Sequence, residues 1–492
     1  MLAKSETKPR MISHQFAMLF CTGIGVLGFA LAYQAPRNLD ATFLWTCLTL
    51  VLALNLTVIA TKWLEGREAN WLSPDALFTL SYTIVNFAYV FFWLSKSLER
   101  HTHIWNFKRA HCPETVCTAT AMALACLATF LAGYYAIPTR LSPSRLFDAI
   151  DARTREKLCL LADWMLRIGF GGFLAFVAII GPSVVFGSYK GTNVYGFIPN
   201  VFYLAGMVTL TSGLVLAIAL RKRYNHRKGT FRSLLDILLV TISLIAMSIH
   251  GDRGTIVFIL GGGIIAFNEY RSKIRVKHAL LLCILAIIAL GLIRARRFEG
   301  RTKNLGILSQ AHSSFVNFGS SSVCNYLAVQ HSPDRHGYYY GIMQFKALVG
   351  IVPFGRRLAG ITDSVENSSS TLFTYLVYGH GSRTGTGTTM FADFYLNFGF
   401  PGTAVIFFIA GAFSQGIRNR SLASNSLRLH VSYVVFCSFL LIVPRYDFTS
   451  GFIRYYIYSM LYITLVSFYL KAPLLLSRFR IREQSRVVHI EN

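Results

Sequence analysis

Long apolar runs separated by short polar stretches dominate the chain throughout its length. A membrane-spanning helix needs about 20 predominantly apolar residues, and runs close to this length recur along the sequence. They lack the apolar-polar alternation of a membrane-spanning β-strand. The pattern therefore predicts an all-α integral membrane protein with about 12 transmembrane helices. The expected spans are 16–33, 41–61, 76–94, 115–137, 165–187, 197–220, 232–249, 254–268, 279–294, 389–414, 429–444 and 453–471.

The spacing of these spans divides the chain into three parts. Residues 1–294 form an N-terminal bundle of about nine spans, and residues 389–492 hold three more and a basic tail. Between them, residues 295–388 form a segment far longer than an ordinary connection. It contains an amphipathic apolar stretch from Tyr338 to Phe354, which we expect to be partly helical and to lie on the membrane surface.

The predicted spans at 232–249 and 254–268 leave two arrangements open. Asp252 and Arg253 interrupt this region, and the second apolar run is short. Two separate spans and one long re-entrant element both fit the pattern.

The composition excludes a water-soluble fold. Hydrophobic residues make up 53% of the 492 residues and charged residues 14%, whereas soluble domains carry roughly 25% charged residues. Intrinsic disorder is excluded as well, because it requires low hydrophobicity.

The net charge of +26 follows the predicted spans. With a cytoplasmic N-terminus, the segments on the cytoplasmic side hold 29 Lys and Arg residues, and the short segments on the other side hold 9. Cytoplasmic loops of membrane proteins carry such an excess, and their charges attract anionic headgroups. We therefore expect a multi-pass protein with both termini cytoplasmic and membrane lipids as partners. Nucleic acid is not expected, because no binding motif accompanies the charge.

Charged residues at the predicted outer ends of the spans are the first candidates for chemistry. Asp252 and Arg253 lie in a short turn between two spans, where a charge at the membrane edge is a functional candidate. An ordinary interfacial turn with a local salt bridge is the alternative. Arg294, Arg296 and Arg297 follow the ninth span, and arginine suits a phosphate because its planar group forms two parallel hydrogen bonds. Anchoring to lipid headgroups is the alternative there.

The approach to the tenth span, from Ser382 to Thr389, is rich in glycine and hydroxyl groups and contains Arg383. Free N–H groups at a helix N-terminus favour an anion, so this turn is a candidate anion site. A simple helix cap by Thr388 or Thr389 is the alternative.

Asp393 lies about one turn into the tenth span, and Asn397 follows on the same face. A carboxylate within a membrane helix is costly unless it faces a polar cavity, so Asp393 is a candidate general base or substrate-binding group. Favourable placement of a carboxylate near a helix N-terminus is the alternative. Gly399 and Pro401 are expected to kink or loosen this helix.

His380 is a lone loop histidine, for which a solvent-exposed or structural role is the simpler interpretation. Arg445 belongs to a further outer cluster with Asp447, and the two side chains are able to pair with each other. The histidines show no spacing with cysteine or carboxylate residues that is typical of a metal site. We therefore expect no metal and no cofactor.

The segment from Gly385 to Gly402 resembles the bacterial oligosaccharide repeat-unit polymerases, the Wzy-type O-antigen polymerase family. Members often show a Gly/Ser/Thr-rich approach, an acidic residue, an aromatic residue, Asn-Phe-Gly and a further glycine. The turn with Arg253 between two apolar spans and the long late loop also resemble the family. The acidic position is commonly Glu in that family, whereas this chain has Asp393.

The resemblance implies a metal-independent membrane glycosyltransferase of the GT-C type at the periplasmic face of the bacterial inner membrane. Such an enzyme moves a growing glycan from undecaprenyl pyrophosphate onto an incoming lipid-linked repeat unit, with inversion. The implied partners are the undecaprenyl-pyrophosphate-linked oligosaccharide, a chain-length regulator and a flippase. On this interpretation, Asp393 is the first candidate base, followed by His380 and Asp252. The expected pyrophosphate and glycan ligands are Arg253, Arg294, Arg296, Arg297, Arg383, Tyr395, Asn397 and Arg445.

Three other functions stay open at this stage. An O-antigen ligase uses the same donor and shares the long late loop, but it usually has a His-Asn motif that His380 does not match. A lipid-linked oligosaccharide flippase predicts charges strung through the membrane, whereas these charges cluster at the outer edge. A scaffold subunit of a secretion complex predicts no outer cleft.

Overall fold

The computed structural model is helical wherever it describes regular structure. It describes residues 7–66, 69–95, 113–138, 152–182, 197–220, 227–250, 253–275, 319–334, 336–352, 354–361, 364–380, 385–424 and 426–448, together with parts of 277–285 and 453–465 and the single residue 316.

Seven of the described helices are long and apolar enough to cross a membrane, by length and composition. Three shorter apolar helices accompany them, and together these ten elements coincide with ten of the predicted spans. The span expected at 279–294 falls largely outside the described residues, and the span expected at 453–471 is described only in part, up to residue 465. The seven are α1 (Thr7–Tyr33), α2 (Ala41–Glu65), α3 (Pro74–Leu94), α5 (Pro113–Ala136), α6 (Ala152–Ile180), α8 (Phe197–Leu220) and α17 (Met390–Ala423), and the three are α9 (Arg227–His250), α10 (Arg253–Tyr270) and α18 (Leu427–Leu440).

Helix boundaries differ from the expected ones at several ends, most clearly at the starts of α1 and α6 and at the end of α17. Helix α6 begins at Ala152, well before the expected start at 165, because charged residues of its first turns extend the helix beyond the apolar run. Helix α17 continues to Ala423 rather than ending near 414. Gly399 divides its 34 residues into two helical parts, and the part after the kink, residues 400–423, rises about 36 Å at 1.5 Å per residue, which exceeds the roughly 30 Å hydrocarbon core of a bilayer. Between 232 and 268 the structure contains two separate helices, α9 and α10.

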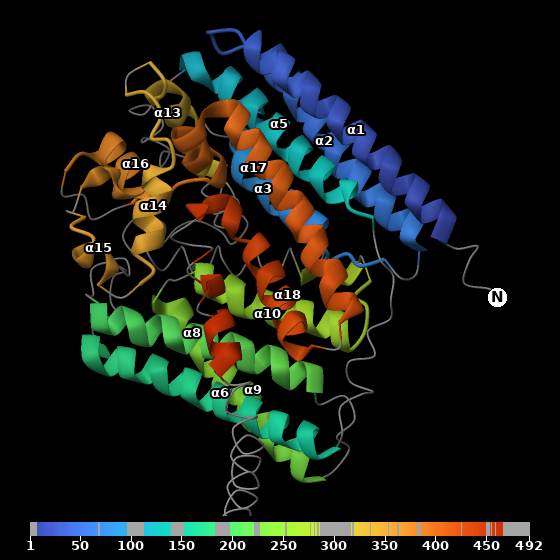
Figure 1. Ribbon diagram of the computed structural model, residues 1–492, viewed down its shortest axis with the longest axis vertical. Helices are drawn as coiled ribbons and strands as arrows, with labels where there is room; N and C mark the ends of the chain where they lie inside the picture. Colours follow the sequence, from blue (N-terminus) through green and yellow to red (C-terminus); the bar gives the residue numbers. More distant parts are fainter. Residues whose placement is uncertain are drawn as a thin grey trace, which may run out of the picture.

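The helices form two packed groups (Figure 1). Helices α1, α2, α5 and α17 run side by side, and α5 packs against both α1 and α17. Helices α6 and α8 pack on each other, and α10 joins α8 to α18. Helix α18 in turn contacts α3 and α17, so that it lies between the two groups.

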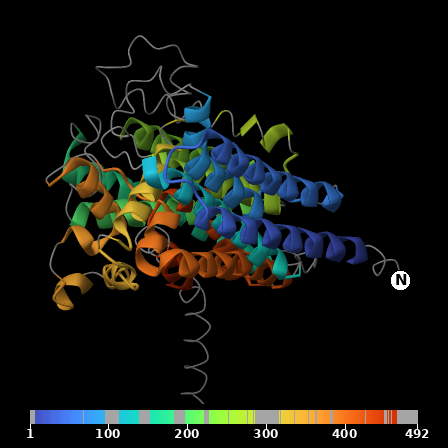
Figure 2. The same cartoon turned by 90° about the horizontal axis from the view of Figure 1, so that it is seen from above.

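Short helices gather at one end of this bundle and are named here the loop-bearing end. Figure 2 shows them in yellow and orange, on the side away from the N-terminus. They belong to the long segment 295–388, of which the structure describes much of residues 319–380. They are η6 (Ser320–Ser322), α13 (Val323–His331), α14 (Ile342–Val349), α15 (Gly355–Leu358), η7 (Val365–Asn367) and α16 (Ser369–Tyr378). A further short helix, η8 (Val443–Arg445), contacts α3, α17 and α18.

Small residues let α5 and α17 approach closely. A Cβ atom built on Gly411 of α17 would lie 1.9 Å from the Phe130 carbonyl oxygen of α5. A Cβ atom built on Gly133 of α5 would lie 2.0 Å from the Phe408 carbonyl oxygen of α17. Helices in membranes associate through such close backbone approach, so this reciprocal pair fixes how the two helices cross.

The outward faces of the spanning helices are apolar. Phe16 of α1 and Trp63 of α2 are 69% and 72% exposed, and Ile198 of α8 is exposed as well. Soluble monomers rarely expose continuous apolar surface of this extent. The surface is therefore that of a chain whose helices contact lipid.

Helix α14 lies within the stretch from Tyr338 to Phe354, so the expected partial helicity of this stretch is confirmed. Met343 and Ala347 are buried on one face of α14, whereas Ile342, Phe345 and Leu348 are exposed on the other. The helix is therefore amphipathic, and its contact with a membrane surface stays a prediction.

A buried ionic cluster lies at the opposite end of the bundle. The ammonium group of Lys62 lies 2.9 Å from Asp75 and 3.5 Å from Glu65, and the imidazole of His14 lies 3.8 Å from Glu65. Asp75 also accepts hydrogen bonds from Ser73 at 2.5 Å and from the hydroxyl group of Tyr135 at 3.1 Å. These groups come from α1, α2, α3 and α5, so the cluster ties four spanning helices together.

Candidate functional site

Asp393 is the centre of the loop-bearing end. It is 2% exposed and lies in the first turn of α17, whose N-cap Thr389 accepts a hydrogen bond from the Ala392 amide at 3.0 Å. The amide group of Gln344 in α14 donates to its Oδ2 atom at 2.6 Å, and the hydroxyl group of Ser369 in α16 donates to Oδ1 at 2.7 Å. A buried carboxylate needs such partners, and here they come from separate elements.

A third donor reaches Asp393 from the C-terminal part of the chain. The backbone amide of Phe448 donates to Oδ2 at 3.1 Å. Asp447 precedes it, so a second carboxylate lies close enough to act on Asp393 electrostatically. A carboxylate offers about four acceptor positions, and donors in the described part of the chain use three of them. Asp393 therefore anchors three neighbouring segments to α17 and retains capacity for one further hydrogen bond.

The other predicted residues of α17 contact the same region. The hydroxyl group of Tyr395 donates to the Ser332 carbonyl oxygen at 3.2 Å, in the turn after α13. The side-chain amide of Asn397 donates to the Asp393 backbone carbonyl oxygen at 2.8 Å. Its Oδ1 atom is buried and has no hydrogen-bond partner within the described part of the chain.

The expected kink of α17 is confirmed at Gly399, which has a φ of 66° inside the helix. The ring of Tyr338 lies 3.0 Å from where a Cβ atom of residue 399 would stand. The Leu396 carbonyl oxygen, just before the kink, accepts a hydrogen bond from the Tyr339 amide at 2.9 Å. The long segment 295–388 thus contributes a backbone hydrogen bond to α17 at its kink.

A polar chain that the sequence did not reveal leads from α17 into the bundle. Thr389 donates to Oδ1 of Asn325 in α13, and Asn325 donates to Oδ1 of Asn86 in α3 at 2.8 Å. Asn86 donates to the Tyr82 carbonyl oxygen at 3.0 Å. The position of Asn86 inside the apolar run of α3 was the one feature of the sequence that could have indicated this chain of hydrogen bonds, since a polar side chain at membrane depth requires a partner.

Arg445 and His380 are also described. Arg445 ends η8, is partly buried and acts electrostatically on Cys324 in α13. His380 is exposed, with its ring 4.4 Å from that of Tyr375. Asp393, Tyr395, Asn397 and Arg445 therefore belong to the loop-bearing end, with His380 on its surface.

The remaining predicted residues receive little structural description. Arg253 is the first residue of α10, and only its backbone is described. Asp252, Arg294, Arg296, Arg297 and Arg383 lie outside the described residues.

Tyr339 also lies in this region, outside the spanning helices. Burial and the nearby Glu366 carboxylate raise the pKa of Tyr339 to about 12. Its hydroxyl group is 3.5 Å from Glu366 and 3.4 Å from Nε2 of His331. Tyr339 therefore stays protonated at neutral pH and is unsuited to act as a base.

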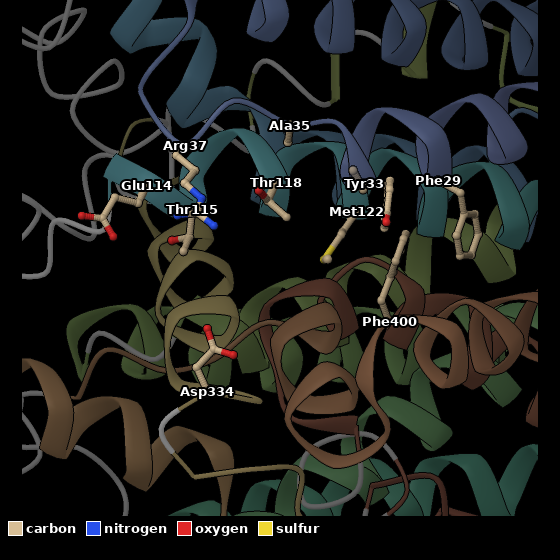
Figure 3. A pocket seen from close by; sticks show the side chains of 11 residues that line it. Phe29, Tyr33, Ala35, Arg37, Glu114, Thr115, Thr118, Met122, Asp334 and Phe400 are labelled. Carbon is tan, nitrogen blue, oxygen red and sulfur yellow. The ribbon is translucent and has the colours of Figure 1, made fainter.

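A cavity of about 580 Å³ opens beside the kink of α17 (Figure 3). The end of α1, the start of α5, the turn after α13 and the kink itself surround it. Sequence reasoning missed this site, because its residues lie on four separate segments without a shared motif. The lining residues are Phe29, Ala32, Tyr33, Ala35, Arg37, Glu114, Thr115, Thr118, Met122, Asp334 and Phe400.

Within the described residues, no group of three or more His, Cys, Asp or Glu side chains is arranged to hold a metal ion. Comparison with known proteins adds no relative: no family model, curated protein or solved structure matches the chain.

Proposed function

We propose that the chain is a membrane glycosyltransferase that polymerises undecaprenyl-pyrophosphate-linked repeat units into O-antigen or a related surface polysaccharide. One observation carries the proposal. The segment that resembles the polymerase family, Gly385 to Gly402, contains the structural centre of the loop-bearing end. Around its acidic residue, Asp393, three separate segments converge, and an open cavity adjoins its kink.

The proposed orientation places the loop-bearing end in the periplasm of a bacterial inner membrane and both termini in the cytoplasm. The excess of Lys and Arg on the other side of the predicted spans supports this orientation. Twelve spans with the long segment 295–388 outside complete the proposed topology. In this orientation Asp393 lies at the membrane edge, where a lipid-linked substrate presents its glycan.

The proposed reaction is an inverting displacement. The acceptor hydroxyl oxygen forms a bond to the anomeric carbon of the growing glycan, and the bond from that carbon to the pyrophosphate oxygen breaks. The hydroxyl proton passes to a base, and undecaprenyl pyrophosphate leaves with the electron pair. General base catalysis by a positioned carboxylate typically contributes a rate factor of roughly 10²–10⁴.

The proposed roles of the residues follow from the proton that the base accepts and the negative charge that develops on the leaving pyrophosphate. Asp393 is the first candidate base because it is buried and has acceptor capacity left beside its three donors, with His380 and Asp252 behind it. Arg253, Arg294, Arg296 and Arg297 stabilise the charge that develops on the pyrophosphate, and Arg383 supports them. Preorganised donors of this kind act strongly where water is excluded. Tyr395, Asn397 and Arg445 complete the proposed glycan-binding group.

Deletion of the gene in its host tests the proposal. The surface polysaccharide of the deletion strain is separated on a silver-stained gel, and the strain is complemented with wild type, Asp393→Asn or Arg297→Ala. Loss of the ladder, with one repeat unit still attached to the core, is the expected result. Neither variant is expected to restore the ladder, whereas Arg357→Gln, which removes an exposed charge of α15, is expected to restore it.

The other outcomes identify the other functions. A bare core with accumulating lipid-linked polymer indicates a ligase. An unchanged ladder contradicts both glycan-transfer functions for that polysaccharide. Repeat units that accumulate on the cytoplasmic side indicate a flippase.

A further inference from the structure

The cavity beside the kink of α17 has two chemically different ends. Phe29, Tyr33, Met122 and Phe400 form an aromatic and apolar end, where the rings of Phe29 and Phe400 stack with centroids 4.3 Å apart. The other lining side chains are mainly charged or carry hydroxyl groups. Ligand sites of proteins have volumes of about 300–1,000 Å³ and combine apolar walls with a few polar groups. The volume of about 580 Å³ falls in that range.

Three charged side chains border the polar end and have no assigned partner. Arg37 lies in the connection after α1, Glu114 at the start of α5, and Asp334 in the turn after α13. All three are exposed. Within the described residues, none of these side chains takes part in a hydrogen bond or ion pair. Figure 3 shows Arg37 and Asp334 on opposite walls of the cavity, with Thr115 and Thr118 on α5 beside Arg37.

The charge balance decides which ligands suit this end. Among the described lining residues, two carboxylates accompany one guanidinium group, so a phosphate or other anion would meet net repulsion from these side chains. A neutral ligand rich in hydroxyl groups suits all three side chains, because carboxylates accept and the guanidinium group donates charge-assisted hydrogen bonds. The apolar C–H face of a sugar ring packs against an aromatic side chain such as Tyr33 or Phe400. A pyranose ring presents both surfaces together.

The cavity adjoins the candidate site through α17. Tyr395 lies between Asp393 and Phe400 on that helix, and its hydroxyl group donates to the Ser332 carbonyl oxygen. Asp334 follows two residues after Ser332, and its carboxylate acts electrostatically on Tyr395. Tyr395 thus connects the wall of the cavity with the surroundings of Asp393.

We propose that this cavity binds an uncharged pyranose ring of the substrate glycan, away from the ring that reacts. The proposal rests on the proposed glycan-transfer function and assigns it a second binding site. Arg37 and Asp334 bind the hydroxyl groups of the ring, Glu114 binds at the cavity mouth, and Tyr33 and Phe400 pack against its C–H face.

Direct binding to the full-length protein in lipid nanodiscs tests the proposal. The probe is the free repeat-unit oligosaccharide released from the host surface polysaccharide, followed by saturation-transfer difference NMR. We expect the double variant Arg37→Gln/Asp334→Asn to bind about tenfold more weakly or worse, because each lost charged hydrogen bond contributes substantially to affinity. Thr118→Phe, which places a ring in the cavity, is expected to abolish binding.

A matched variant serves as the control. Arg357→Gln removes an exposed charge of the same end outside the cavity. It is expected to bind the oligosaccharide like wild type. Size-exclusion profiles of all variants report whether they fold.

Two results overturn the sugar site: wild type fails to bind the oligosaccharide, or the folded cavity variants bind it like wild type. The gene-deletion gel tests the polymerase function separately. Specific binding of the oligosaccharide with an unchanged ladder supports the sugar site and contradicts the polymerase function. A lost ladder without binding supports the polymerase function and contradicts the sugar site.

Discussion

Asp393 combines two properties that rarely occur together in a membrane helix. It is a buried carboxylate, and it is the shared acceptor for α14, α16 and the amide of Phe448. An unpaired buried carboxylate would be very costly, so the short helices and Asp393 stabilise one another. Asp393 therefore positions α14, α16 and Phe448, whether or not it also acts as the base.

Removal of a single donor tests this positioning. Ser369→Ala leaves Oδ1 of Asp393 without that donor and is expected to cost about 1–3 kcal/mol in the free energy of unfolding. Thermal unfolding of the purified protein, with the polysaccharide ladder as the functional readout, measures the effect. Ser370→Ala is the matched control, because the neighbouring hydroxyl group is only partly buried and does not bind Asp393. Equal stability of the two variants would contradict the role of Asp393.

A second residue-scale prediction concerns the ionic cluster at the opposite end. Lys62→Met removes the ammonium group that forms the ion pairs with Asp75 and Glu65, and removal of one partner of a buried pair typically costs about 3–5 kcal/mol. Lys273→Met is the control, since Lys273 is 43% exposed and pairs with Glu269 at 3.3 Å. Surface pairs contribute about 0–1 kcal/mol. Similar thermal unfolding of both variants would show that the Lys62 cluster adds no stability.

The sequence indicated part of the candidate site and missed its partners. A lone acidic residue in an apolar run marked Asp393, and the glycine and proline after it marked the kink at Gly399. Gln344 and Ser369 were not predicted, because they are polar residues of a long segment and nothing local distinguishes them. The sequence used Lys62 only as one of the positive charges that indicate the orientation of the spans. Its ion pair with Asp75 was not predicted, since it depends on how two helices pack.

At the scale of the elements, apolar length was a sufficient signal for the spans. Ten expected spans coincide with described helices because apolar run length sets the length of a membrane helix. The expected end of α17 at 414 was too early because polar residues, Arg418 and Asn419 among them, continue the helix beyond the apolar run. In the structure the guanidinium group of Arg418 donates to the hydroxyl group of Tyr134 at 3.1 Å, and Asn419 donates to the Pro138 carbonyl oxygen at 2.8 Å. These partners are tertiary, so apolar run length does not reveal them.

The crossing of α5 and α17 gives an element-scale prediction. Gly411→Ala forces a methyl group against the Phe130 carbonyl oxygen, and overpacking of this kind costs about 1–3 kcal/mol. Gly416→Ala on the same helix is the control, because no atom lies within 4 Å of its Cβ position. Thermal unfolding of both variants in detergent measures the difference. A Gly411→Ala protein as stable as Gly416→Ala would exclude close backbone packing between the helices.

At the scale of the whole molecule, polar chemistry is concentrated at the two ends of an apolar bundle. Asp393 and the cavity lie at the loop-bearing end, and Lys62 with its partners lies at the other. The exposed apolar side chains cover the faces between them. This division is what a bilayer requires, because polar groups are costly between its two surfaces.

Reporter fusions test the proposed orientation of the whole molecule. Alkaline phosphatase fused after residue 380 is expected to be active, since it requires the periplasm, whereas a fusion after residue 66 is expected to be inactive. Green fluorescent protein at the C-terminus is expected to fluoresce in the cytoplasm. The reverse pattern of phosphatase activity would invert the topology and contradict the periplasmic placement of Asp393.

The hydrogen bond from the Tyr339 amide to the Leu396 carbonyl oxygen has a consequence for protein engineering. The long segment supplies a backbone donor to α17 at its kink and side-chain donors to Asp393. The segment and the first turns of the helix are therefore one folding unit. A chimera that exchanges only residues 319–380 between such proteins would break this unit, and a productive graft must carry residues 319–403 together.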